Sequence, residues 1–150
     1  MSTVLGAKKL EELLRDVASL SVDKSDVKRL LDLLSSKLYD LLVVAARNAT
    51  YNGRDIVMEP DLPITKGLQE SIRQFRVLEQ QIELQPILDF VASQAPLERP
   101  LSEDVEQKLP EIVGALVLVI ARLLKVIDPT VKNPNTSHWD RVEEALNLTL

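Results

Sequence analysis

Hydrophobic residues recur at steps of three and four along two long stretches of the chain. In the first stretch, about residues 26 to 51, they are Val27, Leu31, Leu34, Leu38, Leu41 and Ala45. In the second stretch they are Val105, Leu109, Ile112, Leu116, Val119, Leu123 and Val126. This spacing places side chains on one face of an α-helix. Both stretches are therefore predicted to be long amphipathic helices, and Pro110 is expected to kink the second one.

Shorter helical patterns flank each long helix. They cover residues 7–19, a stretch that begins near 62, residues 82–93 and residues 137–148. Short polar side chains before a helix are typical N-caps. We expect this role for Ser25, Asp61, Ser102 and, at the last helix, Thr136 or Ser137. The chain thus repeats a short–long–short plan, with halves at residues 7–76 and 82–150.

The composition agrees with a helical protein. Hydrophobic residues make up 45% of the 150 positions but aromatic residues only 3%, so Leu, Val and Ile supply the core. There is no cysteine, which excludes disulfides and thiolate metal sites. The longest apolar run, residues 112–121, is too short to cross a bilayer. We expect one compact all-α domain over residues 1–150 with strand content close to nil, located in the cytoplasm and not in a membrane.

Charge is unevenly distributed between the halves. The chain carries a net charge of −5, with twelve basic and eleven acidic residues up to position 76 and six basic and twelve acidic residues beyond it. An acidic protein lacks the usual electrostatic signature of a nucleic-acid binder. Any DNA-binding face is therefore expected on the first half, where the candidate contacts are Lys8, Lys9, Lys24, Lys28 and Arg29.

The loop after the first long helix contains the most informative motif. Asn52-Gly53 tolerates the left-handed conformation that ends many helices. Arg54 and Asp61 follow, seven positions apart, and we expect them to form an ion pair across the loop.

This loop is similar to the second loop of archaeal histones, where a Gly-Arg is followed seven residues later by Asp and an aliphatic residue. The whole chain resembles a small prokaryotic family of unassigned function that carries two fused histone folds. The resemblance is strongest from residue 37 to 63 and again at Lys132-Asn133-Pro134. It implies two histone-like folds joined head to tail in one chain as a pseudodimer with crossing long helices. It also implies that Arg54 and Asp61 fix the loop against the third helix.

The chain departs from DNA-wrapping histones at several positions. Those proteins insert a first-loop Arg into the minor groove and support it with a second-loop Thr, but the matching positions here are Ser21 and Ile56. Asp55 replaces the basic residue after the loop Arg. In the second half, Arg99 lies in the first loop and is the remaining candidate for a groove contact. Asn133 stands where that half would have its Gly-Arg arginine, seven positions before Asp140.

Evidence for catalysis or cofactor binding is weak in the sequence. His138 is the single histidine, and with Asp140 and Glu143 it gives a poor set of metal ligands. No phosphate-binding loop or nucleophile motif is found. We expect a structural role for His138, with Trp139 packed in the core. We predict no enzyme activity, no metal, no cofactor and no small-molecule substrate.

Two hypotheses for function remain. The first is a non-enzymatic histone-fold protein that serves as a structural or protein-interaction module, binding another protein or itself, with weak or no DNA binding. The alternative is a nucleoid-associated protein that binds DNA through the basic face of its first half. The acidic second half and residues Ser21, Asp55 and Ile56 favour the first.

Overall fold

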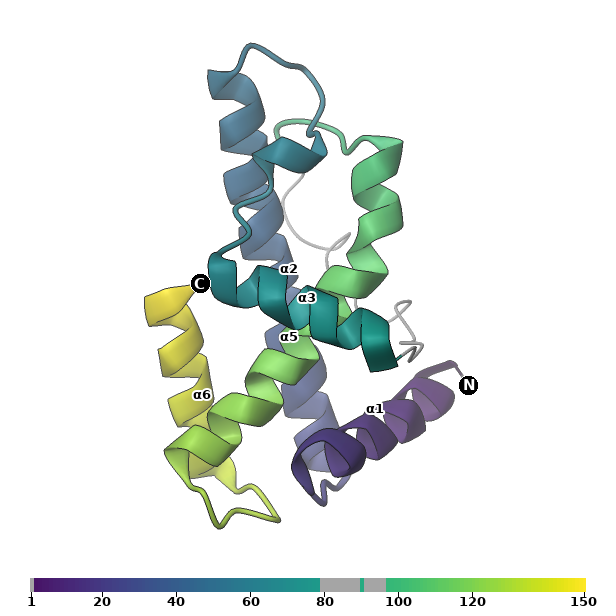
Figure 1. The fold of residues 1–150 in the computed structure, drawn as a ribbon, viewed down its shortest axis with the longest axis vertical. Coiled ribbons are helices and arrows are strands. Elements are labelled where there is room, and N and C mark those ends of the chain that lie inside the picture. Colours follow the sequence, from purple (N-terminus) through teal and green to yellow (C-terminus); the bar gives the residue numbers. More distant parts are fainter. Residues whose placement is uncertain (1, 79–89, 91–96) are drawn as a thin grey trace.

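The computed structural model describes residues 2–78, 90 and 97–150. Its elements are α1 (Ser2–Ala18), α2 (Lys24–Tyr51), the 3₁₀ turn η1 (Glu59–Asp61), α3 (Lys66–Leu78), α5 (Glu103–Ile127) and α6 (Thr136–Thr149) (Figure 1). Within these residues there is no strand beyond an isolated bridge between Val57 and Leu101, which confirms the all-α prediction. The helix predicted at residues 82–93 falls almost entirely outside the described residues.

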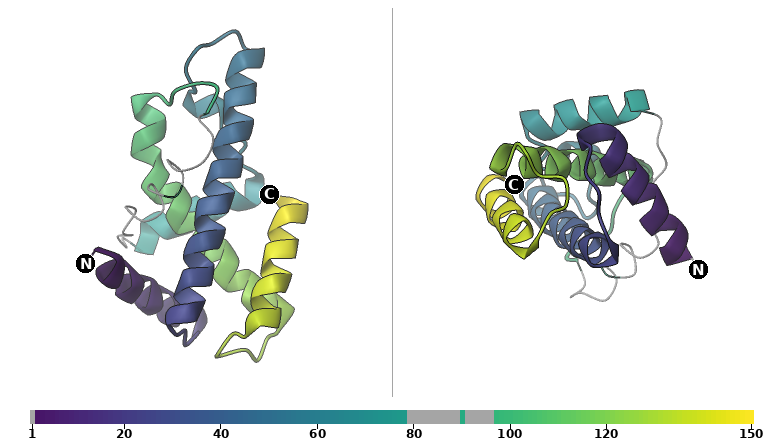
Figure 2. Two further views of the ribbon diagram at one scale, coloured as in Figure 1. Left: turned by 180° about the vertical axis from the view of Figure 1, so that it is seen from behind. Right: turned by 90° about the horizontal axis from the view of Figure 1, so that it is seen from below.

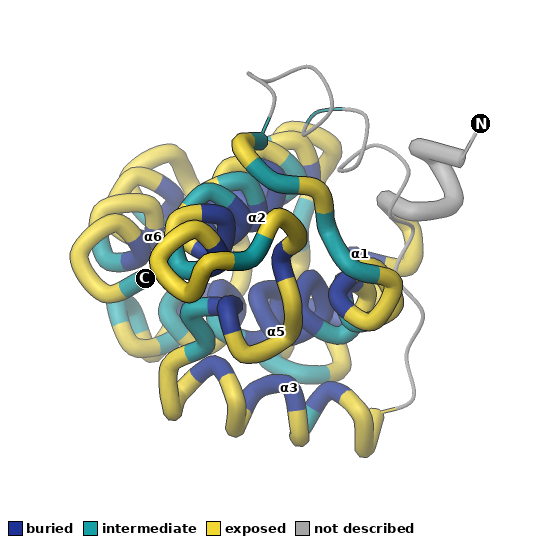
Figure 3. Tube along the Cα trace, turned by 90° about the horizontal axis from the view of Figure 1, so that it is seen from above, coloured by how far each residue is buried: buried dark blue, intermediate teal, exposed yellow. Residues whose placement is uncertain are grey.

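The two long helices cross, and the shorter helices pack around them (Figures 1 and 2). Helix α5 is the most buried element and contacts α1, α2, α3 and α6, as the concentration of buried positions along it shows in Figure 3. The buried side chains form one continuous core that draws on both halves of the sequence. Nearly all of them are aliphatic, as the composition predicts, because few aromatic residues are available.

The closest helix packing joins α3 to α5. Gly114 on α5 faces the ring of Phe75 on α3, and a Cβ atom added at Gly114 would overlap that ring. Phe75 is 5% exposed. The glycine therefore allows an aromatic side chain from the first half to sit directly on the backbone of a second-half helix. Helix α5 also contains Pro110, and it bends along its length in Figure 1, as expected for a proline inside a helix.

The start of α2 is capped differently from the prediction. Asp23, not Ser25, is the N-cap: its carboxylate accepts the Asp26 N–H, and the Asp26 side chain accepts the Asp23 N–H in return. Ser25 instead donates its hydroxyl to Asp23. This reciprocal capping box satisfies two backbone donors at once, which explains why the helix begins two residues earlier.

Two of the other predicted caps are also wrong. Asp61 does not cap the third helix, because residues 62–65 form a loop and α3 begins at Lys66; the Thr65 hydroxyl accepts the Leu68 N–H instead. Helix α6 is capped by Asn135, whose side chain accepts the His138 N–H. Ser102 does cap α5 as predicted, accepting the Val105 N–H at 3.2 Å.

Candidate functional site

Two pairs of loops lie at opposite ends of the longest axis of the molecule (Figure 1). The upper loop pair consists of residues 52–62 and 97–102. The lower loop pair consists of residues 19–23 and 128–135. Each pair joins a loop from the first half to a loop from the second, so these two ends are the places where the halves meet through their backbones.

The upper loop pair is joined by two backbone hydrogen bonds. Val57 donates its N–H to the Pro100 carbonyl and accepts the Ser102 N–H, both at 2.8 Å. The Val57 side chain is fully buried. This short parallel bridge fixes residues 52–62 against the start of α5.

The Arg54–Asp61 pair lies inside this upper loop. The Arg54 guanidinium donates to the Asp61 carboxylate, which also accepts the Met58 N–H at 2.8 Å and the Asn52 amide at 3.5 Å. The side chain of Asp61 is 0% exposed and that of Arg54 is 32% exposed. Burial raises the pKa of Asp61, yet these donors hold it below its ordinary value. Gly53, at φ +70°, makes the left-handed turn that brings Arg54 back toward Asp61.

Arg99 turns toward the first half. Its Nε donates to the Thr50 hydroxyl at 3.4 Å, and its Nη1 lies 3.8 Å from the carboxylate of Asp55. The second loop of its own half offers no evident partner in the sequence. The partners come from the opposite half because each first loop lies beside the second loop of the other half. Applied to the sequence, this pairing of each first loop with the opposite second loop predicts that the partners of Arg99 lie near residues 50–57.

The lower loop pair uses different chemistry. Ser21 donates its N–H to the Lys132 carbonyl at 2.7 Å. The His138 ring bonds to both ends of residues 128–135. Its Nε2 lies 2.9 Å from the carboxylate of Asp128, and its Nδ1 accepts the Asn135 N–H at 2.9 Å. Because Nδ1 is an acceptor, the proton of the neutral ring sits on Nε2. The hydrogen bond from His138, followed by those from Thr130, lowers the pKa of Asp128.

The side chains of α6 near this end bind to α2. The Trp139 indole N–H donates to Asp26 at 2.8 Å, and Trp139 is 1% exposed. Arg29 donates to Asp140 at 3.0 Å and approaches Glu143 at 3.5 Å. Asp140 therefore pairs with α2 and not with Asn133, the residue seven positions before it.

The six residues predicted as DNA contacts are not gathered in one site. Lys8 and Lys9 are exposed on α1, and Lys24 and Lys28 are exposed at the start of α2. These four lysines have no ion pair within the described part of the chain. Arg29 and Arg99 are both engaged with carboxylates, and Arg99 lies at the upper end, away from Lys24 and Lys28 at the lower end.

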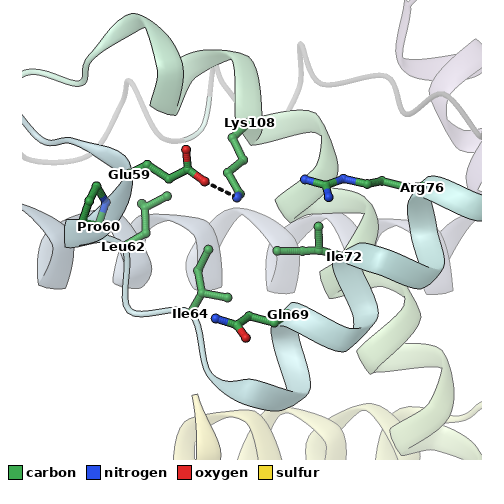
Figure 4. Close-up of a pocket in the computed structure, with 8 residues that line it drawn as sticks. All are labelled: Glu59, Pro60, Leu62, Ile64, Gln69, Ile72, Arg76 and Lys108. Atoms are coloured by element: carbon green, nitrogen blue, oxygen red, sulfur yellow. Dashed lines mark hydrogen bonds and ion pairs between the residues drawn. The ribbon is translucent and has the colours of Figure 1, made fainter.

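An open hollow of about 510 Å³ adjoins the upper loop pair. Half of its lining residues are apolar, and the Glu59–Lys108 ion pair, at 2.6 Å, crosses one side of it (Figure 4). The residues that line it are Glu59, Pro60, Leu62, Ile64, Gln69, Ile72, Arg76 and Lys108. Arg76 binds Glu111 through two hydrogen bonds of 2.9 and 2.7 Å. Both cations of the hollow thus have carboxylate partners.

Other kinds of site have little support in the described residues. No group of three metal-ligating side chains comes together there. None of the described helices combines the length and apolar content needed to cross a bilayer. Both ring nitrogens of His138 are already bonded within the protein.

These features define an all-α protein whose two long helices cross and whose halves are joined by loops at both ends. The chain belongs to the family described as a domain of unknown function (DUF1931), whose profile matches residues 10–147. It is similar to two uncharacterized proteins of Aquifex aeolicus (strain VF5). One is 30% identical over 120 residues, covering 80% of this chain and 70% of the relative. The other is 29% identical over 131 residues, covering 79% and 77%.

Two solved structures are similar over nearly the whole chain. A crystal structure of a Thermus thermophilus protein is 53% identical with a TM-score of 0.91, covering 96% of this chain and 97% of that one. A crystal structure of an Aquifex aeolicus protein is 26% identical with a TM-score of 0.83, covering 97% and 95%. The relatives are thus prokaryotic and share the whole architecture.

Proposed function

We propose that this chain is a histone-fold pseudodimer that acts, without catalysis, as a structural or protein-interaction module and binds DNA weakly or not at all. The fold part of the proposal is supported by the reciprocal loop pairing. The second loop of the first half lies beside the first loop of the second half, through Val57 and Leu101. The first loop of the first half bonds in turn to the second loop of the second half, through Ser21 and Lys132.

The exchange of short helices supports the same arrangement. Helix α3 of the first half packs on α5, the long helix of the second half. Helix α6 of the second half is tied to α2 by the Trp139–Asp26 hydrogen bond and the Arg29–Asp140 ion pair. Each half therefore completes the core of the other, which is the relation that the resemblance to head-to-tail histone pairs implies.

The environment of Arg99 carries the functional part of the proposal. A groove-inserting arginine must be free to approach phosphates, whose neutralisation dominates histone–DNA affinity. Arg99 instead lies 3.8 Å from the carboxylate of Asp55, whose side chain is 100% exposed. An exposed carboxylate at this position repels DNA and neutralises the candidate arginine at the same time.

The alternative, a nucleoid-associated DNA-binding protein, rests on the four exposed lysines. Lys24 and Lys28 lie together at the first turns of α2, with the exposed carboxylate of Asp23 directly before Lys24. We expect such a mixed surface to bind DNA only through weak, salt-sensitive attraction.

Titration of a fluorescently labelled DNA duplex separates the two functions. We expect little or no anisotropy change at moderate salt, and at low salt only weak binding that Lys24→Glu with Lys28→Glu abolishes. Asp55→Lys is the matched gain-of-charge variant and should increase binding if the carboxylate is what repels DNA. Tight binding by the unmodified protein at moderate salt, with a steep dependence on salt, would establish the alternative.

A further inference from the structure

The upper end of the molecule exposes apolar side chains beside the bridge between the halves. Val57 points into the core, but its neighbours Ile56 and Met58 are each 40% exposed. Tyr51, at the end of α2 that leads into this loop, is 90% exposed. Exposed apolar side chains on neighbouring residues of one loop and the helix that leads into it are typical of an interaction surface.

The hollow of Figure 4 adjoins the loop that carries Ile56 and Met58, because Glu59, Pro60 and Leu62 of that loop line it. Glu59 follows Met58 directly and lies at the edge of the hollow, whose apolar lining includes Leu62, Ile64 and Ile72. An open depression with such a lining accommodates an inserted side chain of a partner, as the central pockets of protein interfaces do. A small anionic ligand fits it poorly, because its cations already have carboxylate partners.

The charge around this surface indicates the chemistry of its occupant. Residues 52–62 and 97–111, which the Val57–Leu101 bridge places side by side, contain eight acidic and three basic residues. Their net charge is −5, or −4 when Arg76 is included, which lines the hollow and pairs with Glu111. The three basic residues, Arg54, Arg99 and Lys108, each pair with a carboxylate of the same region. Asp104 lies at the first turn of α5 and is exposed without an ion pair in the described part of the chain.

We propose that this apolar surface, made of Tyr51, Ile56, Met58 and the adjoining hollow, binds a basic segment of a partner protein that carries apolar side chains. The apolar residues supply the contact area, and the surrounding carboxylates select a cationic partner and repel acidic ones. This inference rests on the proposed function of the chain as an interaction module, and it names the surface and the partner class.

Three synthetic peptides of equal length test the proposal with the intact protein. The first is an amphipathic peptide of Lys and Leu, the second replaces every Lys by Glu, and the third replaces every Leu by Ser. Each is labelled and titrated with the protein, and binding is followed by fluorescence anisotropy. We expect the Lys–Leu peptide to bind at least about tenfold more tightly than either of the others, because only it satisfies both charge and apolar contact.

Two double variants locate the surface. Ile56→Ser with Met58→Ser removes apolar contact, and Asp55→Asn with Asp104→Asn removes charge. Each is expected to weaken binding of the Lys–Leu peptide, the first by about tenfold and the second by roughly threefold, with the salt dependence reduced in the second. Because all four side chains are exposed, we expect the circular-dichroism spectrum to be unchanged.

Matched controls carry the same chemical changes elsewhere. Val126→Ser with Leu148→Ser alters two side chains that are 75% and 80% exposed on α5 and α6. Glu12→Gln with Glu144→Gln removes two exposed charges from α1 and α6. Neither control should affect peptide binding. If the controls weaken binding as much as the upper-end variants do, the location is wrong.

Other outcomes also bear on the proposal. Equal binding of the Lys–Ser peptide would show simple charge attraction and would overturn the apolar surface. Salt-sensitive self-association of the protein in sedimentation, lost in the upper-end variants, would make a second copy the occupant and overturn the assignment of a separate basic partner. The DNA titration is independent: tight DNA binding would refute the proposed function even if the peptide bound, and absent peptide binding would refute only this surface.

Discussion

The two loop pairs join the halves at opposite ends of the molecule but are stabilised in different ways. The upper pair contains a buried carboxylate, Asp61, that accepts hydrogen bonds from donors in its own loop. The lower pair contains Asp128, whose side chain is 37% exposed, bonded to His138. Residues 52–62 and 97–111 carry a net charge of −5, whereas residues 19–29 and 125–135 carry five basic and three acidic residues. The same plan of helices can therefore be closed by an ion pair with a fully buried carboxylate at one end and by a partly exposed polar network at the other.

The difference in burial predicts a difference in stability between the two ends. Asp61→Ala leaves the Met58 N–H and the Arg54 guanidinium without their acceptor. We expect the free energy of unfolding to fall by about 3 kcal/mol, measured by urea denaturation. Asp55→Ala, in the same loop but fully exposed, is the control and should leave the midpoint unchanged. A loss below about 1 kcal/mol for Asp61→Ala would show that the upper loop does not depend on its carboxylate.

Removing the other partner should cost less. Arg54→Ala leaves Asp61 with the Met58 N–H, and the guanidinium is partly exposed in the native protein. We expect a loss of about 1–3 kcal/mol. Combining Arg54→Ala with Asp61→Ala should cost less than the sum of the two single changes, because the variants share one interaction. An additive result would mean that the two side chains stabilise the loop independently.

At the lower end, Trp139→Phe removes the hydrogen bond from the indole N–H to Asp26. The substitution keeps most of the buried ring but removes the N–H that Asp26 accepts. Asp26 retains its bond from the Asp23 N–H. The expected loss is about 1 kcal/mol for the hydrogen bond plus the cost of the cavity left by the missing ring atoms, again measured by urea denaturation. The same substitution in an Asp26→Asn background should have a different effect, and an identical effect would show that packing alone accounts for the change.

The pH dependence of the free energy of unfolding should report on one aspartate at each end. The pKa values of both Asp61 and Asp128 are lowered in the folded protein relative to the ordinary value of 3.8. A lowered pKa contributes stability above the unfolded value and loses it as pH falls through the folded value. Stability should therefore decrease below about pH 4. Asp61→Asn and Asp128→Asn should each flatten this acid limb, because each removes a carboxylate whose pKa is lowered by its hydrogen-bond donors; a limb that neither variant changes would mean that these two carboxylates do not contribute to it.

The architecture was largely predictable because it depends on periodicity. Steps of three and four in the apolar residues give the long helices directly, and the Asn52-Gly53 turn brings Arg54 toward Asp61 as the motif indicates. Helix starts were predicted less well, because several short polar residues precede each helix. The choice of Asp23 over Ser25 depends on the reciprocal bond from Asp26.

The long-range partners could not be read from local patterns. Arg99 meets Thr50 and Asp55, 49 and 44 positions earlier in the chain. The Trp139–Asp26 bond likewise spans 113 positions. Such contacts follow from how the halves are placed relative to each other, and no spacing rule within one helix or loop contains that information.

The contact between Phe75 and Gly114 sets an order of events during synthesis. Phe75 is made 39 positions before the glycine that receives its ring. At about 5–20 residues per second, roughly 2–8 s pass between the translation of Phe75 and that of Gly114. Until α5 is made, the apolar face of α3 that carries Phe75 lacks the helix on which it packs.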